Sequence, residues 1–152
     1  MTTAETAYQK FLPEQIPGYH KPFWESLRQH EVQVQRCDDC GTYRYVPKEI
    51  CPNCQSDRST WTSIAGTGEI YTYTVVRRAP TKAYQADAPY AIVHVSMDEG
   101  FRMIGTVPDI APDDVRIGQR VRVRYLDVTP EWTLLAFESI PAPAESSGVG
   151  SG

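Results

Sequence analysis

The chain has 152 residues, with 15 Lys and Arg against 19 Asp and Glu, and its formal net charge is -4. Its 41% hydrophobic and 22% charged residues are typical of a globular protein, which excludes a disordered chain and leaves one domain or two small ones sharing a core. No stretch approaches the ~20 apolar residues that a membrane span needs, and the N-terminal sequence lacks the apolar core of a signal peptide, so we expect a cytoplasmic protein without a membrane partner.

The first thirty residues predict an arm followed by a short helix. Residues 1–20 contain two prolines and a glycine and predict an extended, poorly packed arm. Residues 21–30 predict a helix, because a proline stands near its first turn and Phe23, Trp24 and Leu27 fall on one side at helical spacing. We interpret Trp24 as an anchor in the core rather than a contact for a partner.

The four cysteines, Cys37, Cys40, Cys51 and Cys54, form two Cys-x-x-Cys pairs separated by ten residues. The short gap lets both thiolates of a pair reach one ion, and two pairs complete a tetrahedral shell of four sulfurs. Disulfides need an oxidising compartment, and a redox dithiol normally uses one such pair near a βαβ unit, which nothing here resembles. Iron in a rubredoxin-like site would use the same four thiolates, with the pairs usually farther apart. We therefore predict one structural zinc ion per chain, because four protein thiolates leave no open position for water or substrate.

Short strands surround the cysteines, at residues 32–35 and 42–46. Gly41 follows the first pair, where its freedom to adopt positive φ lets backbone amides turn toward the sulfurs. Hairpins of this size do not fold alone, so residues 31–60 predict a zinc ribbon held by the metal. Such a site needs no histidine ligand, and we interpret all three histidines as ordinary surface or half-buried side chains: His20, His30 and His94.

From Trp61 onward the pattern predicts strands only. Five segments carry this pattern, and an Asp98-Glu99-Gly100 turn joins the second to the third. These segments are 68–76, 90–97, 101–107, 120–127 and 132–139. Five strands in about 75 residues, with a turn-rich link before the fourth, favour an OB-type barrel, and a small five-stranded sandwich is the alternative. The chain thus divides into an arm and helix (1–30), a ribbon (31–60), an OB-fold (61–140) and a flexible tail (141–152).

Nucleic-acid binding and catalysis are both weakly supported by the residues. Five tyrosines could stack on bases: Tyr71, Tyr73, Tyr84, Tyr90 and Tyr125. A protein that follows phosphates normally carries a basic excess, whereas this chain is acidic, and we interpret the arginines at 120–124 as the solvated side of a strand. The paired carboxylates fall in turn-like segments and no nucleophile–base motif surrounds a serine, so we expect no catalytic residue in this chain.

The loop at residues 77–84 holds three cations in six residues of an otherwise acidic chain. Its candidate binding residues are Arg77, Arg78, Lys82 and Tyr84. Cations on a flexible loop suit a phosphate-bearing small molecule or an acidic partner surface. A solvated hairpin loop explains the same residues without any ligand, and the sequence leaves both interpretations open.

The order of motifs over residues 22–140 resembles one family. The first half of the match is Phe23-Trp24 with Leu27, Gln35-Arg36-Cys37-Asp38-Asp39-Cys40-Gly41 and Cys51-Pro52-Asn53-Cys54. The second half is the segment GTGEIYTYT at 66–74, Ala88-Pro89-Tyr90, Asp98-Glu99-Gly100 and Gly118-Gln119-Arg120-Val121. Together they resemble the bacterial and archaeal acyl-CoA-associated family, which has an N-terminal helix, a rubredoxin-like zinc ribbon and an OB-fold. The family often has a second proline between the cysteine pairs, where this sequence keeps only Pro47.

The resemblance implies an accessory role. Members accompany thiolase-superfamily enzymes that make or break carbon–carbon bonds on CoA thioesters, including acetoacetyl-CoA thiolase with hydroxymethylglutaryl-CoA synthase, and retro-aldolases of steroid side-chain degradation. In some actinobacteria the module is fused to a MaoC-like hydratase domain, which is not found in this sequence, so the resemblance implies a stand-alone subunit or an excised module. The family's OB surface can form a shared CoA path or complete the partner's dimer, which makes the loop with Arg77, Arg78, Lys82 and Tyr84 a contact for CoA phosphate or the partner.

We therefore expect a mostly β, non-catalytic, zinc-binding accessory subunit in a hetero-oligomer with a thiolase-superfamily protein that acts on acyl-CoA thioesters. The partner would supply the nucleophile or base, and retro-aldol cleavage of a steroid side chain is one specific form of the reaction. The alternative is a free-standing OB module that binds CoA or single-stranded nucleic acid.

Overall fold

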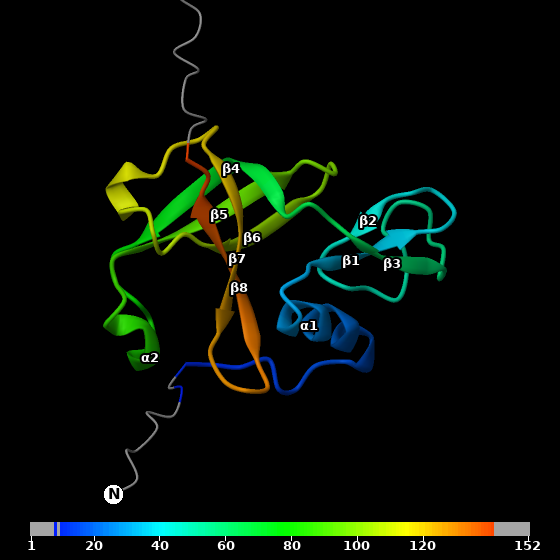
Figure 1. Cartoon of the computed structure of the whole chain (residues 1–152), viewed down its shortest axis with the longest axis horizontal. Helices are drawn as coiled ribbons and strands as arrows, with labels where there is room; N and C mark the ends of the chain where they lie inside the picture. Colours follow the sequence, from blue (N-terminus) through cyan, green and yellow to red (C-terminus); the bar gives the residue numbers. More distant parts are fainter. Residues whose placement is uncertain (1–7, 9, 142–152) are drawn as a thin grey trace, which may run out of the picture.

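The computed structural model describes residue 8 and residues 10–141, arranged as two antiparallel sheets with one helix beside both (Figure 1). The strands are β1 (Gln33–Cys37), β2 (Tyr43–Arg44), β3 (Ser59–Ser63), β4 (Thr67–Val76), β5 (Tyr90–Met97), β6 (Arg102–Thr106), β7 (Arg120–Asp127) and β8 (Thr133–Ser139). The helices are η1 (Gly18–His20), α1 (Lys21–Arg28), the single turn α2 (Lys82–Gln85) and η2 (Pro112–Asp114). Among the described residues, no helix has the length and apolarity to cross a membrane.

Helix α1 forms where the sequence predicted it and ends two residues earlier, at Arg28. Its end is a Schellman motif: the amide of His30 donates to the carbonyl of Leu27 at 2.9 Å, and that of Glu31 to the carbonyl of Ser26 at 3.0 Å. The motif needs a left-handed residue after the helix, and His30 supplies it with φ 56°. A histidine therefore occupies a position where glycine is usual.

Trp24 packs against the core, as predicted. Its ring meets Phe23 edge-on at 5.2 Å and Trp132, beside β8, at 5.9 Å. Phe23 and Leu27 are buried, and each contributes about 1.5–3 kcal/mol by leaving water. The apolar face of α1 thereby fastens the helix to β8 and β1.

The ribbon sheet has the order β2-β1-β3. Strand β3 pairs with β1 along its whole length, from Gln33 opposite Ser63 to Cys37 opposite Ser59. Sequence analysis missed β3, because the segment STWTS has little apolar alternation, and the strand crosses the boundary expected at residue 60. Strand β2 spans only Tyr43–Arg44, shorter than the expected 42–46.

The larger sheet has the order β6-β5-β4-β7-β8, which confirms the OB-type fold. Strands β5 and β7 have the predicted bounds, and each end of the other three lies within one residue of its prediction. The two ends of the order meet across the barrel: a Cβ added to Gly105 of β6 would lie 3.0 Å from the Phe137 ring of β8. Glycine at this position lets the sheet curl until its outer strands pack together.

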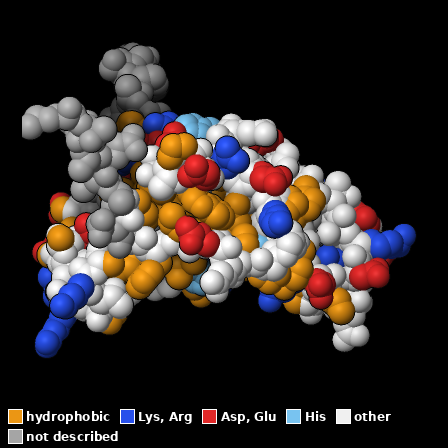
Figure 2. Space-filling model, turned by 90° about the horizontal axis from the view of Figure 1, so that it is seen from below, with side chains coloured by type: hydrophobic (Ala, Val, Ile, Leu, Met, Phe, Trp, Pro, Cys, Tyr) orange, Lys and Arg blue, Asp and Glu red, His pale blue; other side chains and the backbone are white. Residues whose placement is uncertain are grey.

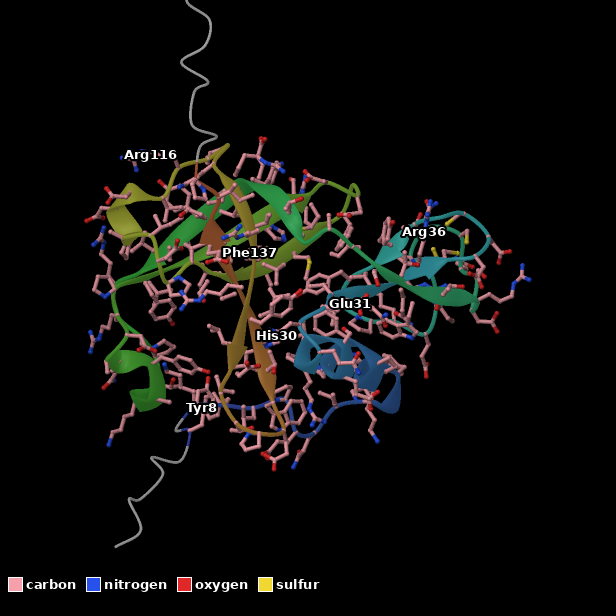
Figure 3. All side chains as sticks on the ribbon, in the orientation of Figure 1. Tyr8, His30, Glu31, Arg36, Arg116 and Phe137 are labelled. Atoms are coloured by element: carbon pink, nitrogen blue, oxygen red, sulfur yellow. The ribbon has the colours of Figure 1, made fainter. Side chains whose placement is uncertain are left out.

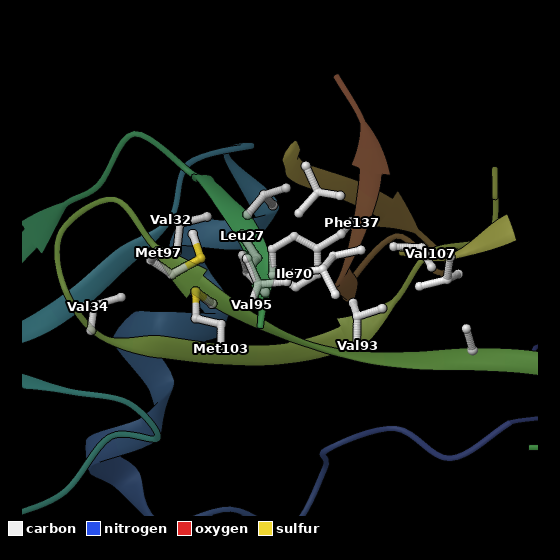
Figure 4. Close-up of a cluster of buried hydrophobic side chains, with 14 of the residues drawn as sticks. Leu27, Val32, Val34, Ile70, Val93, Val95, Met97, Met103, Val107 and Phe137 are labelled. Atoms are coloured by element: carbon white, nitrogen blue, oxygen red, sulfur yellow. The ribbon is translucent and has the colours of Figure 1, made fainter. Parts of the chain in front are cut away.

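The core lies inside this barrel and extends to the start of the ribbon (Figure 4). Burial alternates along the whole of β5, as expected for a strand with one face inward. The largest fully buried apolar side chains are Phe137, Leu27, Ile70, Met103, Val32, Val34, Val93, Val95, Val115 and Val121. Val32 and Val34 flank the entry to the ribbon, so one hydrophobic cluster holds ribbon and barrel together.

The described part of the N-terminal arm is as loosely packed as predicted: none of its residues is buried, and Phe11 is 68% exposed. It is held at two points, where Lys10 forms an ion pair with Asp87 at 2.5 Å and the ring of Phe11 lies 6.0 Å from that of Tyr84. The expected loop at 77–84 contains part of the helical turn α2, which supplies this contact. The flexible tail expected at 141–152 lies outside the described residues, except for Pro141.

Candidate metal centre and cationic loop

The four predicted cysteines come together at the far end of the ribbon, where Figure 3 shows their sulfurs near Arg36. All four Sγ atoms lie within 4.8 Å of one another, with 3.5 Å between Cys37 and Cys54 and 3.6 Å between Cys40 and Cys51. All four are free, and these distances are far beyond a disulfide bond of about 2.05 Å. Zinc bound to four sulfurs at about 2.3 Å requires sulfurs about 3.8 Å apart, so the set fits a tetrahedral ion.

The two cysteine pairs have the same backbone geometry. The amide of Gly41 donates to the carbonyl of Cys37 at 3.0 Å, and the amide of Gln55 donates to the carbonyl of Cys51 at 3.0 Å. Gly41 has φ 76°, as the sequence predicted, and Gln55 has φ 64° in the equivalent place. The second pair therefore makes the same turn without the glycine that normally permits it.

Arg44 of β2 lies beneath both pairs and is almost completely buried, with 1% of its surface exposed. Its guanidinium donates to the carbonyls of Ser56 at 2.8 Å and Arg58 at 3.0 Å. The same two carbonyls accept the backbone amides of Cys51 and Asp38, so Arg44 holds both pairs in register. Sequence analysis missed this role, because an arginine in a short alternating strand gives no sign of burial.

Two further polar side chains tie the ribbon loops together. The carboxylate of Asp39 accepts hydrogen bonds from the Ser56 hydroxyl and the Arg58 guanidinium, and these bonds lower the pKa of Asp39. The buried Gln35 accepts the amide of Lys48 at 2.7 Å. Loops this short have no core of their own, and hydrogen bonds replace packing around the metal centre.

The thiols of the centre differ in acidity. The Thr42 hydroxyl, 3.2 Å from Cys40 Sγ, the Thr42 backbone amide and the Asn53 side chain together lower the pKa of Cys40 to about 5. The backbone amide of Cys40 lowers the pKa of Cys37. The Ser56 amide would lower the pKa of Cys54, but burial and the other three sulfurs together raise it to about 12. Four negative sulfurs this close need a cation among them, and a bound dication supplies it by displacing the remaining protons.

The structure divides the four residues of the predicted cationic loop into two groups. Arg77 donates to Asp113 of η2 at 2.8 Å, and Tyr84 is half-buried against the arm, with Lys10 Nζ 5.9 Å from its ring. Arg78 and Lys82 are exposed, and neither forms an ion pair with another described residue. Arg77 and Tyr84 thus contact other described residues, although the Arg77 side chain stays 65% exposed, and Arg78 and Lys82 are exposed to solvent.

His30 and Asp127 form a second polar group that the sequence did not predict. His30 Nε2 lies 2.9 and 3.0 Å from the two carboxylate oxygens of Asp127, and Thr133 donates to the same carboxylate at 2.6 Å. The ring of His30 stacks on that of Tyr125, with 4.9 Å between the ring centres. These bonds lower the pKa of Asp127, Thr133 having the largest effect. The group lines one side of a polar cleft of about 630 Å³ between α1 and the β7–β8 turn.

Comparison with known sequences assigns both parts of the chain. A profile of the ChsH2 rubredoxin-like zinc ribbon domain matches residues 24–60, and a profile of the ChsH2 C-terminal OB-fold domain matches residues 61–126. A DUF35 domain-containing scaffold protein of Methanocaldococcus jannaschii is 40% identical over 104 residues, which are 67% of this chain and 73% of the scaffold protein.

Longer relatives contain this module as one part. A probable enoyl-CoA hydratase alpha subunit of Thermomonospora curvata is 36% identical over 125 residues, which are 82% of this chain and 39% of that subunit. The 3-oxo-4,17-pregnadiene-20-carboxyl-CoA hydratase alpha subunit of Mycobacterium tuberculosis is 34% identical over 116 residues, which are 76% of this chain and 36% of that subunit. The chain therefore spans less than two-fifths of the length of these hydratase subunits.

A solved chain of the Ltp2-ChsH2(DUF35) aldolase superposes with a TM-score of 0.72 at 34% identity, covering 82% of this chain and 96% of that chain. The fold and the four-cysteine centre thus define a zinc-ribbon and OB-fold protein. Within that class, the chain belongs to the ChsH2 (DUF35) family.

Proposed function

We propose that this chain is a non-catalytic, zinc-binding accessory subunit of a thiolase-like complex that acts on acyl-CoA thioesters. The observation that carries the proposal is the similarity to the Ltp2-ChsH2(DUF35) aldolase chain, which extends over 96% of that chain. Hydratase alpha subunits and DUF35 scaffold proteins among the relatives also support a role beside other proteins. In this proposal the partner supplies the nucleophile or base, and the reaction is carbon–carbon bond cleavage or formation, including retro-aldol cleavage of a steroid side chain.

The metal in the proposal is one structural zinc ion per chain, held by Cys37, Cys40, Cys51 and Cys54. A four-thiolate shell leaves no position for substrate, so its function is to fold the ribbon. Metal analysis of the purified protein should find about one zinc per chain, and Cys51→Ser should lose it and unfold the ribbon. His20→Ala is the control and should keep the zinc. Iron, or a Cys51→Ser protein as stable as wild type, would contradict this role.

The complex can be tested with a thiolase-superfamily enzyme encoded beside this chain. Co-expression should yield a hetero-oligomer that survives size-exclusion chromatography, and removing this chain should lower the enzyme's activity or solubility. Assays with steroid and short-chain acyl-CoA thioesters would separate retro-aldol from thiolytic cleavage by their products. If the enzyme is stable and fully active without this chain and never associates with it, the proposed accessory role is wrong.

Arg78 and Lys82 are the residues of the cationic loop that we propose to contact CoA phosphate or the partner. Both are exposed, and neither forms an ion pair with another described residue, whereas Arg77 donates to Asp113 and the ring of Tyr84 lies near Phe11. The double variant Arg78→Ala/Lys82→Ala should raise the KM for acyl-CoA or weaken assembly. The charge-matched control is Lys21→Ala/Lys48→Ala, which removes two exposed lysines outside the loop. Unchanged kinetics and assembly would leave these cations as a solvated loop. Tight binding of CoA by the isolated chain would instead favour a free-standing CoA module.

A further inference from the structure

The barrel carries an uncovered face on β4, β5 and β6. Cross-strand pairing places Thr72, His94 and Ile104 in one row, and the next row is Thr74, Ile92 and Thr106. On β5 the neighbours Ala91, Val93 and Val95 are buried in the core, so His94 and Ile92 point outward, and the residues paired with them lie on the same face. We call these two rows, together with Tyr71 at the bulge in β4, the outer sheet face.

The outer sheet face differs in composition from an ordinary solvated sheet. Neither row contains a charged residue, apart from any proton on His94. Ile104 is 53% exposed in the middle of β6, and Tyr71 is 49% exposed at the bulge in β4. The solvent-facing side of an antiparallel sheet normally carries polar and charged residues. The centre of a protein interface is instead depleted of charged residues and enriched in aromatic side chains.

Charges border the outer sheet face at both ends. At one end the Arg102 guanidinium lies 3.7 Å from the centre of the Tyr71 ring, and Glu69 stands in the same row of the sheet. Arg120, opposite Glu69 on β7, is held by Asp98 at 2.8 Å, so these two charges balance each other. At the other end, after β4, Arg78 is exposed. Outside the Arg120–Asp98 pair, these border residues are therefore two cations, Arg102 and Arg78, against one acid, Glu69.

We propose that the outer sheet face docks onto the enzyme subunit of the complex, against an apolar patch with an acidic rim. The uncharged side chains around Ile104 and Tyr71 favour an apolar surface on the partner. The border cations Arg102 and Arg78 favour acidic residues around that surface. An arginine that lies over a tyrosine ring combines two residue types that are enriched among the binding hot spots of interfaces. This inference rests on the proposed function and names the surface that the accessory role uses.

The test compares two exposed isoleucines. Ile104→Asp places a charge in the centre of the outer sheet face and should weaken binding to the enzyme subunit about tenfold or more. Ile117 is 67% exposed but lies in the loop before β7, outside this face, so Ile117→Asp should bind like wild type. Ile104→Thr keeps a β-branched residue in the strand and should weaken binding with no loss of fold. Circular dichroism and zinc content would verify that each variant is folded.

The outcomes separate this inference from the proposed function. If wild type forms no complex with the enzyme subunit, the proposed function fails. If wild type binds and Ile104→Asp and Ile104→Thr bind equally well, the complex exists but uses another surface, and the inference is overturned. Tyr71 and Arg102 could instead bind a nucleic acid, and fluorescence anisotropy with labelled single-stranded DNA or RNA tests this alternative. Tight binding of nucleic acid that Ile104→Asp abolishes would also overturn the protein-docking assignment.

Discussion

The two turns of the metal centre make a matched pair of substitutions possible. Gly41 and Gln55 occupy equivalent positions after the two cysteine pairs, with φ 76° and 64°. Glycine accepts this conformation freely, whereas an L-residue pays roughly 1–2 kcal/mol for it. Gln55→Gly should therefore stabilise the ribbon, and Gly41→Ala should destabilise it.

The expected magnitudes follow from the surroundings of each turn. Glycine also increases the conformational entropy of the unfolded chain, which lowers the stability of the folded state by about 0.4–1 kcal/mol. The net gain in folding free energy for Gln55→Gly should therefore be about 0.5–1 kcal/mol. A Cβ added to Gly41 would meet the Arg36 guanidinium at 3.6 and 3.8 Å, which is ordinary contact. The loss in Gly41→Ala, about 1 kcal/mol, should therefore come from the backbone alone and not from a clash.

Zinc affinity is the direct measure, because the ribbon folds around the metal. Competition with a chromogenic chelator should show zinc held about 2–5-fold more tightly by Gln55→Gly and a few-fold more weakly by Gly41→Ala. Gln55→Ala removes the side chain but keeps the conformational cost, so its affinity should stay near that of wild type. If Gln55→Gly weakened zinc binding as much as Gly41→Ala, the backbone equivalence of the two turns would be refuted.

Three further predictions test the rest of the fold. His30→Ala should lower the free energy of unfolding in urea by about 1 kcal/mol, because the stacked ring and the Asp127 contact disappear. His30→Gly should lower it less, because glycine suits the left-handed position. An equal loss in both variants would contradict this explanation. Gly68→Ala should unfold the barrel or require a backbone shift, since its Cβ would lie 2.4 Å from a carbonyl oxygen of β5, and Gly18→Ala, with no atom within 4 Å, should melt like wild type. Arg120 and Thr67 lower the pKa of Asp98 to about 2, below its unfolded value of about 3.9. The stabilisation by the Asp98 carboxylate should therefore be present above pH ~4 and lost as the pH falls through 2. The stability difference between wild type and Asp98→Asn should shrink over this pH range, and a constant difference would refute the assignment.

Much of the candidate site was predictable because its ligands are close in sequence. A Cys-x-x-Cys pair can turn both sulfurs to one side whatever surrounds it, so Cys37 and Cys40 already define half of the shell. The same local logic predicted the left-handed turn at Gly41. It could not predict Gln55, because nothing in the residue type of glutamine indicates positive φ.

The cationic loop shows where local reasoning stops. Its residues were visible as a cluster of charges, but their partners come from other parts of the chain: Asp113 takes Arg77, and the N-terminal arm covers Tyr84. Only these distant contacts separate Arg77 and Tyr84 from Arg78 and Lys82, the two loop residues without an ion pair to the part of the chain that the structure describes. Which loop residues have partners depends on contacts between segments far apart in the sequence, and a local sequence pattern does not contain that information.

The sequence by itself determined the metal ligands, the strands of the barrel and the helix with Trp24, because each depends on spacing along a few covalently linked residues. Only the tertiary structure decided that Arg44 lies buried beneath both cysteine pairs, that β3 completes the ribbon, and that His30 meets Asp127. Those features arise from segments brought together by burial of a shared core. The outer sheet face belongs to the same group, since exposure of Ile104 depends on which strand faces are covered after folding.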